Sequence, residues 1–189
     1  MAMEETKQLL TDIKAELRLY MNGVMAQSLR ERGLKYRLIF GIELPRLKEI
    51  ASHYAPNHDL AQALWKEDIR ECRILAGLLQ PTESFLPELA DIWLEQMHDT
   101  ELIDYTCMNL FRRLPCASVK AFEWMAAEDV LTQYAGFRLM GHLLSRPGAE
   151  LNPRSHDEFI DQAQAALASE NVTLRQAAQT ALERLNEKK

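Results

Sequence analysis

The 189-residue sequence contains no uncharged apolar run of roughly 18 residues, the length that a membrane-spanning helix requires. Its opening residues, MAMEETKQLLTDIKAEL, are charged from the fourth position and lack the apolar core of a signal peptide. Only three cysteines occur (Cys72, Cys107 and Cys116), an odd number without CxxC spacing. This pattern argues against a disulfide framework and a structural zinc site, so we expect a cytoplasmic protein.

Several common catalytic and cofactor motifs are also missing. The sequence has no GxGxxG, no GxxxxGK(S/T) and no GxSxG, so dinucleotide, P-loop and hydrolase-elbow functions have no support. Its five histidines form no HExxH motif and do not pair with cysteine at ligand spacing. We therefore expect neither a metal nor another cofactor.

Acidic residues outnumber basic ones, and the net charge of −6 argues against indiscriminate binding to nucleic acid. The charge is unevenly distributed, however. Residues 18–48 carry seven lysines or arginines against two acids, whereas residues 76–189 carry ten basic and seventeen acidic residues. A basic face is therefore compatible with the acidic total.

Glycine and proline are scarce, with seven of each, and they fall between periodic segments, as is typical of a helical protein. No segment alternates clearly as a strand does, although residues 35–44 (KYRLIFGIEL) come closest. Two capping boxes are predicted at helix starts. In one, Ser155 is the cap and Glu158 reaches back; in the other, Asp68 and Glu71 have these roles.

Four segments share one plan, in which a helix ends, the chain turns at Asp or Asn, and a second helix begins. The turns lie at Asp68, Asp99, Asp129 and Asn171. The last segment shows a continuous apolar face from Leu174 to Leu185. This periodicity predicts an all-α fold, namely a right-handed superhelix of about five HEAT-like helix pairs that forms a single domain over residues 1–189.

The segments GLKYRLIFGIELPRLKEIA and LAQALWKEDIRECRILAGLL resemble the opening of the AlkD-like DNA alkylation repair proteins. The arrangement of Gly33, Gly41, Pro45 and Ala51, followed by Leu-Trp and an acidic turn, carries the resemblance. It covers residues 15–80 well and the rest more weakly. The family implies a HEAT-like DNA glycosylase that removes positively charged alkylated purines.

Active relatives use an aspartate beside the cationic nucleoside, two flanking tryptophans and a phosphate-holding arginine. Aligning the repeats places the tryptophans at Ile103 and Thr180, the aspartate at Cys107 and the arginine at Tyr134, so all four positions depart from the family pattern. Asp104 lies beside this position and is the candidate substitute carboxylate. The resemblance therefore indicates a member that lacks the known catalytic residues.

Some residue types that could carry chemistry are better explained by packing. Cys107 occupies the aspartate position, but no neighbouring base or cation is identified that would hold a thiolate. We expect it to be a buried small hydrophobe, like Cys72 and Cys116. Trp65, Trp93 and Trp124 lie late in the first helices of the repeats, where packing between helices explains them.

Basic residues in the second helices, together with the basic segment, can form a ladder facing a phosphate backbone. The predicted nucleic-acid-binding residues are Lys35, Arg37, Arg70, Arg73, Arg112, Arg113, Arg138 and Arg175. The alternative is that each is a solvated residue pairing with a local acid, such as Glu71 or Asp104.

We therefore expect a non-catalytic HEAT-like binding module whose concave basic groove holds nucleic acid, with duplex DNA as the expected partner. A protein partner in the same groove is an alternative that the acidic C-terminal half favours. The other alternative is a DNA glycosylase for alkylated purines that uses Asp104.

Overall fold

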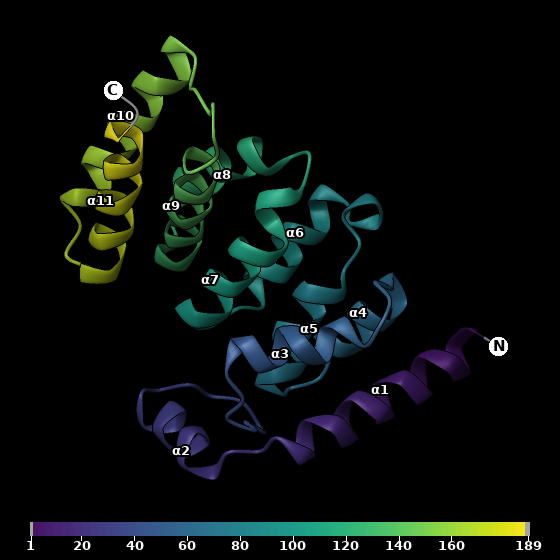
Figure 1. Cartoon of the computed structure of the whole chain (residues 1–189). Helices are drawn as coiled ribbons and strands as arrows, with labels where there is room; N and C mark the ends of the chain where they lie inside the picture. Colours follow the sequence, from purple (N-terminus) through teal and green to yellow (C-terminus); the bar gives the residue numbers. More distant parts are fainter. Residues whose placement is uncertain (1, 188–189) are drawn as a thin grey trace. The chain divides into compact units, whose positions relative to one another are not determined.

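The computed structural model describes residues 2–187, and Figure 1 shows its helices. These residues contain eleven α-helices, two short 3-10 helices and no β-strand, which confirms the all-α class. The chain divides into two compact units, Met1–Phe85 and Leu86–Lys189, called here the first and second units.

The first unit contains five α-helices. Its long N-terminal helix packs on the fourth helix, and both the third and fourth helices pack on the fifth. A 3-10 helix, η1 (Thr82–Ser84), follows the last of them. The helices are α1 (Ala2–Leu19), α2 (Gly23–Glu31), α3 (Leu44–Ser52), α4 (His58–Trp65) and α5 (Arg70–Leu79).

The segment most like a strand in sequence forms no strand, apart from one isolated parallel bridge between Leu38 and Ile69, and its last residue, Leu44, begins α3. The capping box predicted at Asp68 and Glu71 was wrong, because α5 has Ile69 as its N-cap and no side chain caps it. Asp68 instead accepts a hydrogen bond from the Arg37 backbone N–H at 3.1 Å. Glu71 accepts a hydrogen bond from the Phe40 backbone N–H at 2.9 Å, so both carboxylates bind the segment before α3 rather than the start of their own helix.

The second unit is built of helix pairs. In it, α9 packs on its partner α8 and also on α7 and α11, so the second helices of three successive pairs lie side by side (Figure 1). The elements are α6 (Pro87–Glu95), α7 (Thr100–Asn109), η2 (Phe111–Arg113), α8 (Ala117–Met125), α9 (Val130–Leu144), α10 (Pro153–Leu167) and α11 (Val172–Asn186). This is the predicted pairing of helices.

These three second helices start in the same way. The side chains of Asp99, Asp129 and Asn171 each accept a hydrogen bond from the backbone N–H three residues on, at 2.8–2.9 Å. Such caps satisfy backbone donors that the first turn leaves unpaired, and they confirm three of the four predicted turn residues.

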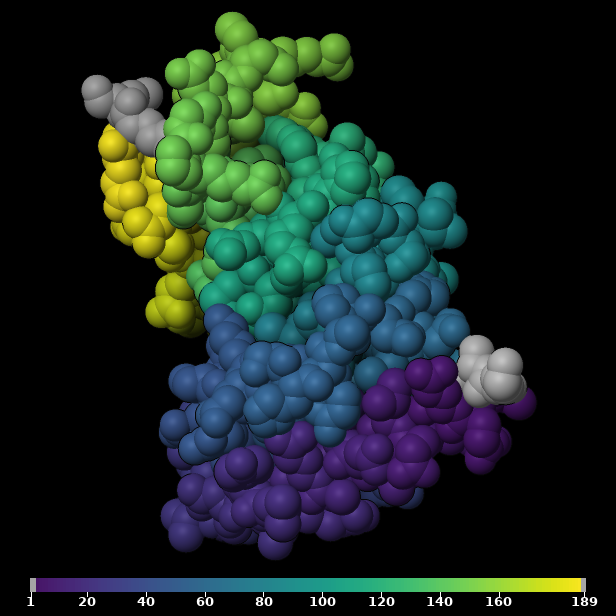
Figure 2. Space-filling view, turned by 45° about the vertical axis from the view of Figure 1, so that its right-hand side comes forward, coloured from purple at the N-terminus to yellow at the C-terminus, as the bar shows by residue number. Residues whose placement is uncertain are grey.

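The predicted cap Ser155 was wrong. The N-cap of α10 is Asn152, which is followed by Pro153 and accepts a hydrogen bond from the Ser155 backbone N–H at 2.9 Å. Proline suits the first turn because its missing N–H would have no partner there. The loop before α10 and the start of that helix project from the second unit in the space-filling view (Figure 2, light green).

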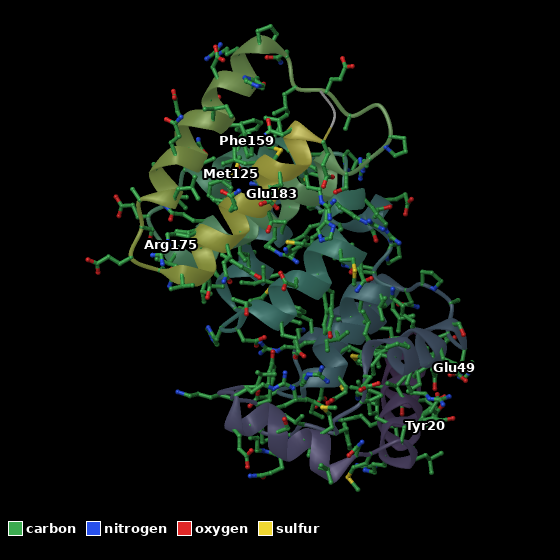
Figure 3. All side chains as sticks on the ribbon, turned by 60° about the vertical axis from the view of Figure 1, so that its left-hand side comes forward. Tyr20, Glu49, Met125, Phe159, Arg175 and Glu183 are labelled. Atoms are coloured by element: carbon green, nitrogen blue, oxygen red, sulfur yellow. The ribbon has the colours of Figure 1, made fainter. Side chains whose placement is uncertain are left out.

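Aromatic side chains fill the interior of each unit. The predicted packing role of Trp65, Trp93 and Trp124 is confirmed, since each is at most 4% exposed. In the second unit the Phe111 and Trp124 rings lie 5.2 Å apart. The fully buried Phe159 of α10, labelled in Figure 3, lies 6.5 Å from Phe137 of α9 between ring centres. These ring contacts join η2 to α8 and join α9 to the first helix of the next pair, α10.

Candidate nucleic-acid interface

A pocket of about 220 Å³ opens in the second unit among side chains of α7, α9 and α11. Its lining includes Asp104 from α7, Tyr134 and Arg138 from α9, and Thr180 from α11. Two of these residues, Tyr134 and Thr180, occupy positions that the family resemblance assigns to an arginine and a tryptophan. The fold thus gathers the candidate carboxylate and two altered positions around one pocket, which is called here the Asp104 pocket.

One carboxylate oxygen of Asp104 carries two strong contacts. The Tyr134 hydroxyl donates to Oδ1 at 2.8 Å, and Nε of Arg138 donates to the same oxygen at 2.6 Å. Tyr134 and Arg138 are one turn apart on α9, so their side chains lie on the same helix face. Asp104 and Arg138 are about one-third exposed, with side-chain exposures of 32% and 30%.

The pKa shifts of Tyr134 and Arg138 follow from this geometry. Burial raises the pKa of the Tyr134 hydroxyl, and the charge of Asp104 beside it raises it further. Burial lowers the pKa of Arg138, but the attraction of Asp104 outweighs that effect and the net pKa is raised. At neutral pH the pocket therefore holds a neutral phenol and a charged ion pair.

The other altered positions lie in the interior. Ile103 and Cys107 are both fully buried, and the Cys107 thiol lies 3.8 Å from the Ala135 carbonyl oxygen. Its full burial confirms the prediction that Cys107 is a buried small hydrophobe, and the same burial raises the pKa of its thiol. Cys72 is likewise fully buried, whereas Cys116 is half-buried.

A second pocket, of about 140 Å³, adjoins the first, since Arg138, Ala177 and Thr180 line both. Arg138 and His142 reach it from α9, and Arg184 reaches it from α11. Burial lowers the pKa of His142, and the positive charges of Arg138, Arg112 and Arg184 lower it further. This region is called here the α9–α11 pocket.

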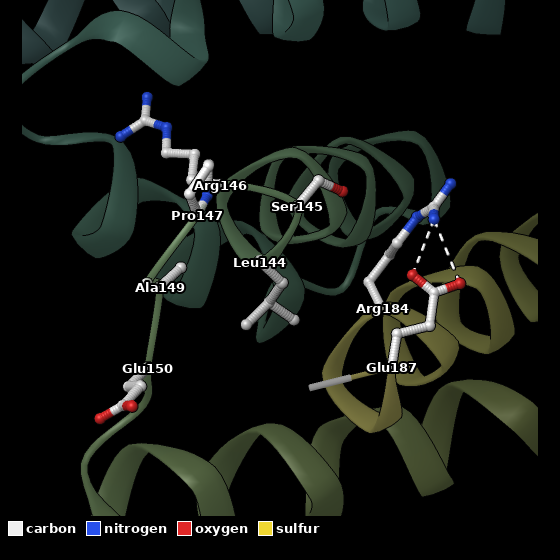
Figure 4. A pocket seen from close by; sticks show the side chains of 9 residues that line it. Leu144, Ser145, Arg146, Pro147, Ala149, Glu150, Arg184 and Glu187 are labelled. Atoms are coloured by element: carbon white, nitrogen blue, oxygen red, sulfur yellow. Dashed lines mark hydrogen bonds and ion pairs between the residues drawn. The ribbon is translucent and has the colours of Figure 1, made fainter. Parts of the chain in front are cut away.

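A third and wider pocket, of about 550 Å³, lies between the loop after α9 and the end of α11 (Figure 4). Arg184 and Glu187 form an ion pair on its wall, with nitrogen–oxygen distances of 2.9 and 3.2 Å. In that loop Arg146 donates a hydrogen bond to the Arg112 carbonyl, which joins it to η2.

The predicted basic residues of the second unit have different environments. Arg112 and Arg113 are exposed on η2, and Arg138 lies between the two pockets. Arg175 instead braces the turn before α11 (Figure 3), because it donates to the Ser169 and Glu170 carbonyls at 2.7 and 3.0 Å.

Those of the first unit also separate into two groups. Lys35 and Arg37 are exposed. Arg70 is only 3% exposed and donates hydrogen bonds to the Ile42 carbonyl and to Glu71. Its guanidinium is therefore bound within the first unit. The Arg73 guanidinium lies over the Trp65 ring, 5.4 Å from its centre.

His142 and Arg184 are absent from the basic residues that the sequence predicts. His142 follows Arg138 by four residues, which on a helix gives the two side chains a common face. That spacing was the available signal. Arg184 has no such local signal, because its approach to α9 depends on how α11 packs.

Comparison with known proteins assigns the chain to a family. The family model described as "DNA alkylation repair enzyme" matches residues 13–189. The chain belongs to this family. No curated protein matches this DNA alkylation repair family member significantly.

One solved structure resembles this family member throughout most of its length. It is described as "A new family of proteins related to the HEAT-like repeat DNA glycosylases with affinity for branched DNA structures". The TM-score is 0.84 at 17% identity, and the match covers 93% of this chain and 75% of that chain. The likeness confirms the HEAT-like fold.

Two absences hold within residues 2–187. No helix there combines the length and apolar character needed to cross a bilayer. The same residues contain no group of three or more His, Cys, Asp or Glu side chains placed to hold a metal ion.

Proposed function

We propose that this member of the DNA alkylation repair family is a DNA-binding module that does not excise bases. The observation that carries the proposal is the state of Asp104, whose Oδ1 accepts from both Tyr134 and Arg138. Base excision develops positive charge on the sugar, and a carboxylate stabilises that charge through its field. An arginine at 2.6 Å neutralises much of the field where it would be needed.

The surroundings of Asp104 support the same conclusion. Ile103 and Cys107, which stand at the tryptophan and aspartate positions of the resemblance, are both fully buried and cannot contact a ligand. Thr180 in the pocket wall has no π face to offer to a cationic base. The Asp104 pocket therefore lacks the aromatic surfaces that hold a cationic nucleoside.

Basic groups on the second unit supply the contacts to DNA in this proposal. Arg138 lines the pockets of α7, α9 and α11, and Arg112 and Arg113 are exposed on η2, which packs on α7 and α9. Lys35 and Arg37, exposed on the first unit, are additional phosphate contacts. Arg70, Arg73 and Arg175 are left out, because each is held by its own fold contacts. The affinity for branched DNA named for the structural relative motivates testing branched substrates.

The test is fluorescence anisotropy with a linear duplex and a four-way junction, at several salt concentrations. Each phosphate contact contributes a slope of about −0.9 in log affinity against log salt, so the double variant Arg112→Gln, Arg113→Gln is expected to reduce the slope by about two. Arg154→Gln on α10 is the control, because it removes an exposed arginine of the same unit that lines none of the three pockets. Absence of binding at low salt would overturn the proposal and direct attention to a protein partner.

A second candidate function is removal of alkylated purines by Asp104. The observation in its favour is that this carboxylate lines a pocket and keeps 32% of its side chain exposed. A base-release assay on alkylated duplex DNA distinguishes the two functions. Release that Asp104→Asn abolishes would establish the glycosylase, whereas no release by a protein that binds the duplex supports the module.

A further inference from the structure

The α9–α11 pocket is lined by basic side chains from two helices. Arg138 and His142 come from α9 and Arg184 comes from α11. Arg112 of η2 lies close enough for its charge to act on His142, and η2 packs against α9. Two hydroxyl side chains, Ser145 and Thr180, also line this pocket. Cationic and hydroxyl donors around a small concavity are the groups that bind a tetrahedral oxyanion.

We propose that the α9–α11 pocket binds one phosphate group through Arg138, His142 and Arg184. The inference rests on the DNA-binding function proposed above, in which the phosphate belongs to a DNA strand. It adds the position of one backbone contact and a histidine that gains a proton when the contact forms. Both an internal phosphodiester and a terminal phosphate present this chemistry.

The two arginines can turn toward such a ligand without unfolding anything. Within residues 2–187 the Arg138 guanidinium makes its one hydrogen bond through Nε, which leaves the terminal nitrogens for a ligand. Arg184 pairs with Glu187, but the side chains are 46% and 60% exposed. An ion pair in water contributes little, so a phosphate can replace the Glu187 carboxylate.

The charges around His142 come from every side. On its own helix Arg138 lowers the pKa, as do Arg112 of η2 and Arg184 of α11, while Asp104 of α7 raises it. The neighbouring helices α6 and α8 also pack on α9. Lys120 of α8 pairs with Asp91 of α6 and with Glu123 of its own helix. The remaining acids of α6, Glu88 and Glu95, are exposed.

A phosphate would reverse this balance. Burial and three arginines hold the pKa of His142 below its usual value near 6.5, so the free protein carries a neutral ring at neutral pH. A bound phosphate favours the charged ring, so the pKa of His142 rises in the complex. By linkage, affinity increases as pH falls through the pKa of the complex toward that of the free protein.

The first experiment follows the His142 ring by NMR during pH titration of the whole chain, with His142→Gln to assign the signal. The probes are inorganic phosphate, a duplex with 5′-hydroxyl ends and the same duplex with 5′-phosphates. The expected result is a raised His142 pKa with at least one probe. A response to both duplexes identifies an internal phosphodiester, and a response to the phosphorylated duplex alone identifies a strand end.

The second experiment measures affinity by anisotropy. His142→Gln and Arg184→Gln are each expected to weaken binding about three- to tenfold, and the histidine variant is expected to lose the affinity gain at low pH. Glu187→Gln frees Arg184 and is expected to bind more tightly. Arg154→Gln, with an exposed side chain on α10, is the matched control, and thermal unfolding verifies that each variant is folded.

The outcomes separate this inference from the function on which it rests. If the Arg112, Arg113 double variant weakens binding while His142→Gln and Arg184→Gln bind like the control, the pocket is overturned and DNA binding stands. If no duplex binds but inorganic phosphate raises the His142 pKa, DNA binding is overturned and the pocket remains a phosphate site. A His142 pKa that no probe changes overturns the pocket.

Discussion

The backbone N–H of Gly41 donates a hydrogen bond of 2.9 Å to Oε1 of Glu71, which is fully buried in the first unit. The other carboxylate oxygen accepts from the Phe40 N–H at the same distance. Gly41 has a φ of 77°, and a Cβ there would lie 2.3 Å from the Asn22 carbonyl oxygen. The Glu71 side chain of α5 thus fixes the segment before α3, and position 41 in that segment has a backbone conformation and surroundings that only glycine fits.

Replacing Glu71 with glutamine is expected to destabilise the protein by about 3 kcal/mol or more, because the amide keeps one acceptor oxygen and leaves Arg70 buried without its counter-charge. Urea unfolding measures the loss. Glu49→Gln is the control, because Glu49 is 54% exposed in its ion pair with Arg46 and is expected to change stability by less than about 1 kcal/mol. Equal effects of the two changes would contradict the structural role of Glu71.

Substitution by alanine at two glycines of α9 is expected to change the stability of the protein in opposite directions. A Cβ at Gly136 would lie 2.5 Å from the Met125 backbone nitrogen, so Gly136→Ala forces α8 and α9 apart at a cost of about 1–3 kcal/mol. At Gly141 the nearest atom is 4.0 Å away, and Gly141→Ala is expected to gain up to about 1 kcal/mol from helix propensity. Thermal unfolding of the pair checks both signs, and a stabilising Gly136→Ala would refute the close packing of these helices.

The lowered pKa of His142 gives stability a pH dependence. Burial and the neighbouring arginines disfavour the charged ring in the folded state, so below the unfolded pKa of about 6.5 the unfolded chain binds more protons. The contribution of His142 is therefore present above that pH and is lost as pH falls through the folded-state pKa. Urea unfolding between pH 5 and 8 is expected to show a shallower acid-side slope for His142→Gln than for the unchanged chain. Identical slopes would contradict the lowered pKa.

Asp129 is the N-cap of α9, and the loss of stability on replacing it is expected to depend on whether the new side chain keeps an acceptor oxygen. The side chain accepts from the Thr132 backbone N–H at 2.8 Å, so Asp129→Ala is expected to cost about 1 kcal/mol. Asp129→Asn keeps an acceptor oxygen and is expected to stay within about half a kcal/mol of the unchanged chain. Chemical denaturation of both variants measures this difference, and the prediction fails if asparagine costs as much as alanine.

How far the fold is predictable from sequence depends on how local each interaction is. The helix pairs, the caps at Asp99, Asp129 and Asn171, and the buried tryptophans follow from periodicity and from contacts three residues apart. Asp68 and Glu71 show the limit, because both carboxylates bind backbone about thirty residues away instead of capping their helix. In sequence, an acidic residue that caps a helix cannot be distinguished from one that binds distant backbone.

The candidate site shows the same limit. Asp104 and Arg138 can be identified from the repeat pattern, but their ion pair depends on how α7 and α9 pack. The approach of Arg184 to His142 likewise requires the packing of α11 on α9. Arg70 is misjudged for a related reason, since its burial comes from the Ile42 carbonyl and Glu71 rather than from its own helix pattern.

The double contact on Asp104 restricts what evolution, in nature or in the laboratory, can do with this pocket. A selection for base release would need to free the carboxylate, yet removing Arg138 alone leaves the Tyr134 hydroxyl on the same oxygen. Removing Tyr134 alone leaves the arginine. Each single step gives up a tie between α7 and α9 before any catalytic benefit exists. Freeing this carboxylate therefore takes two changes, and each of them removes a contact that joins α7 to α9.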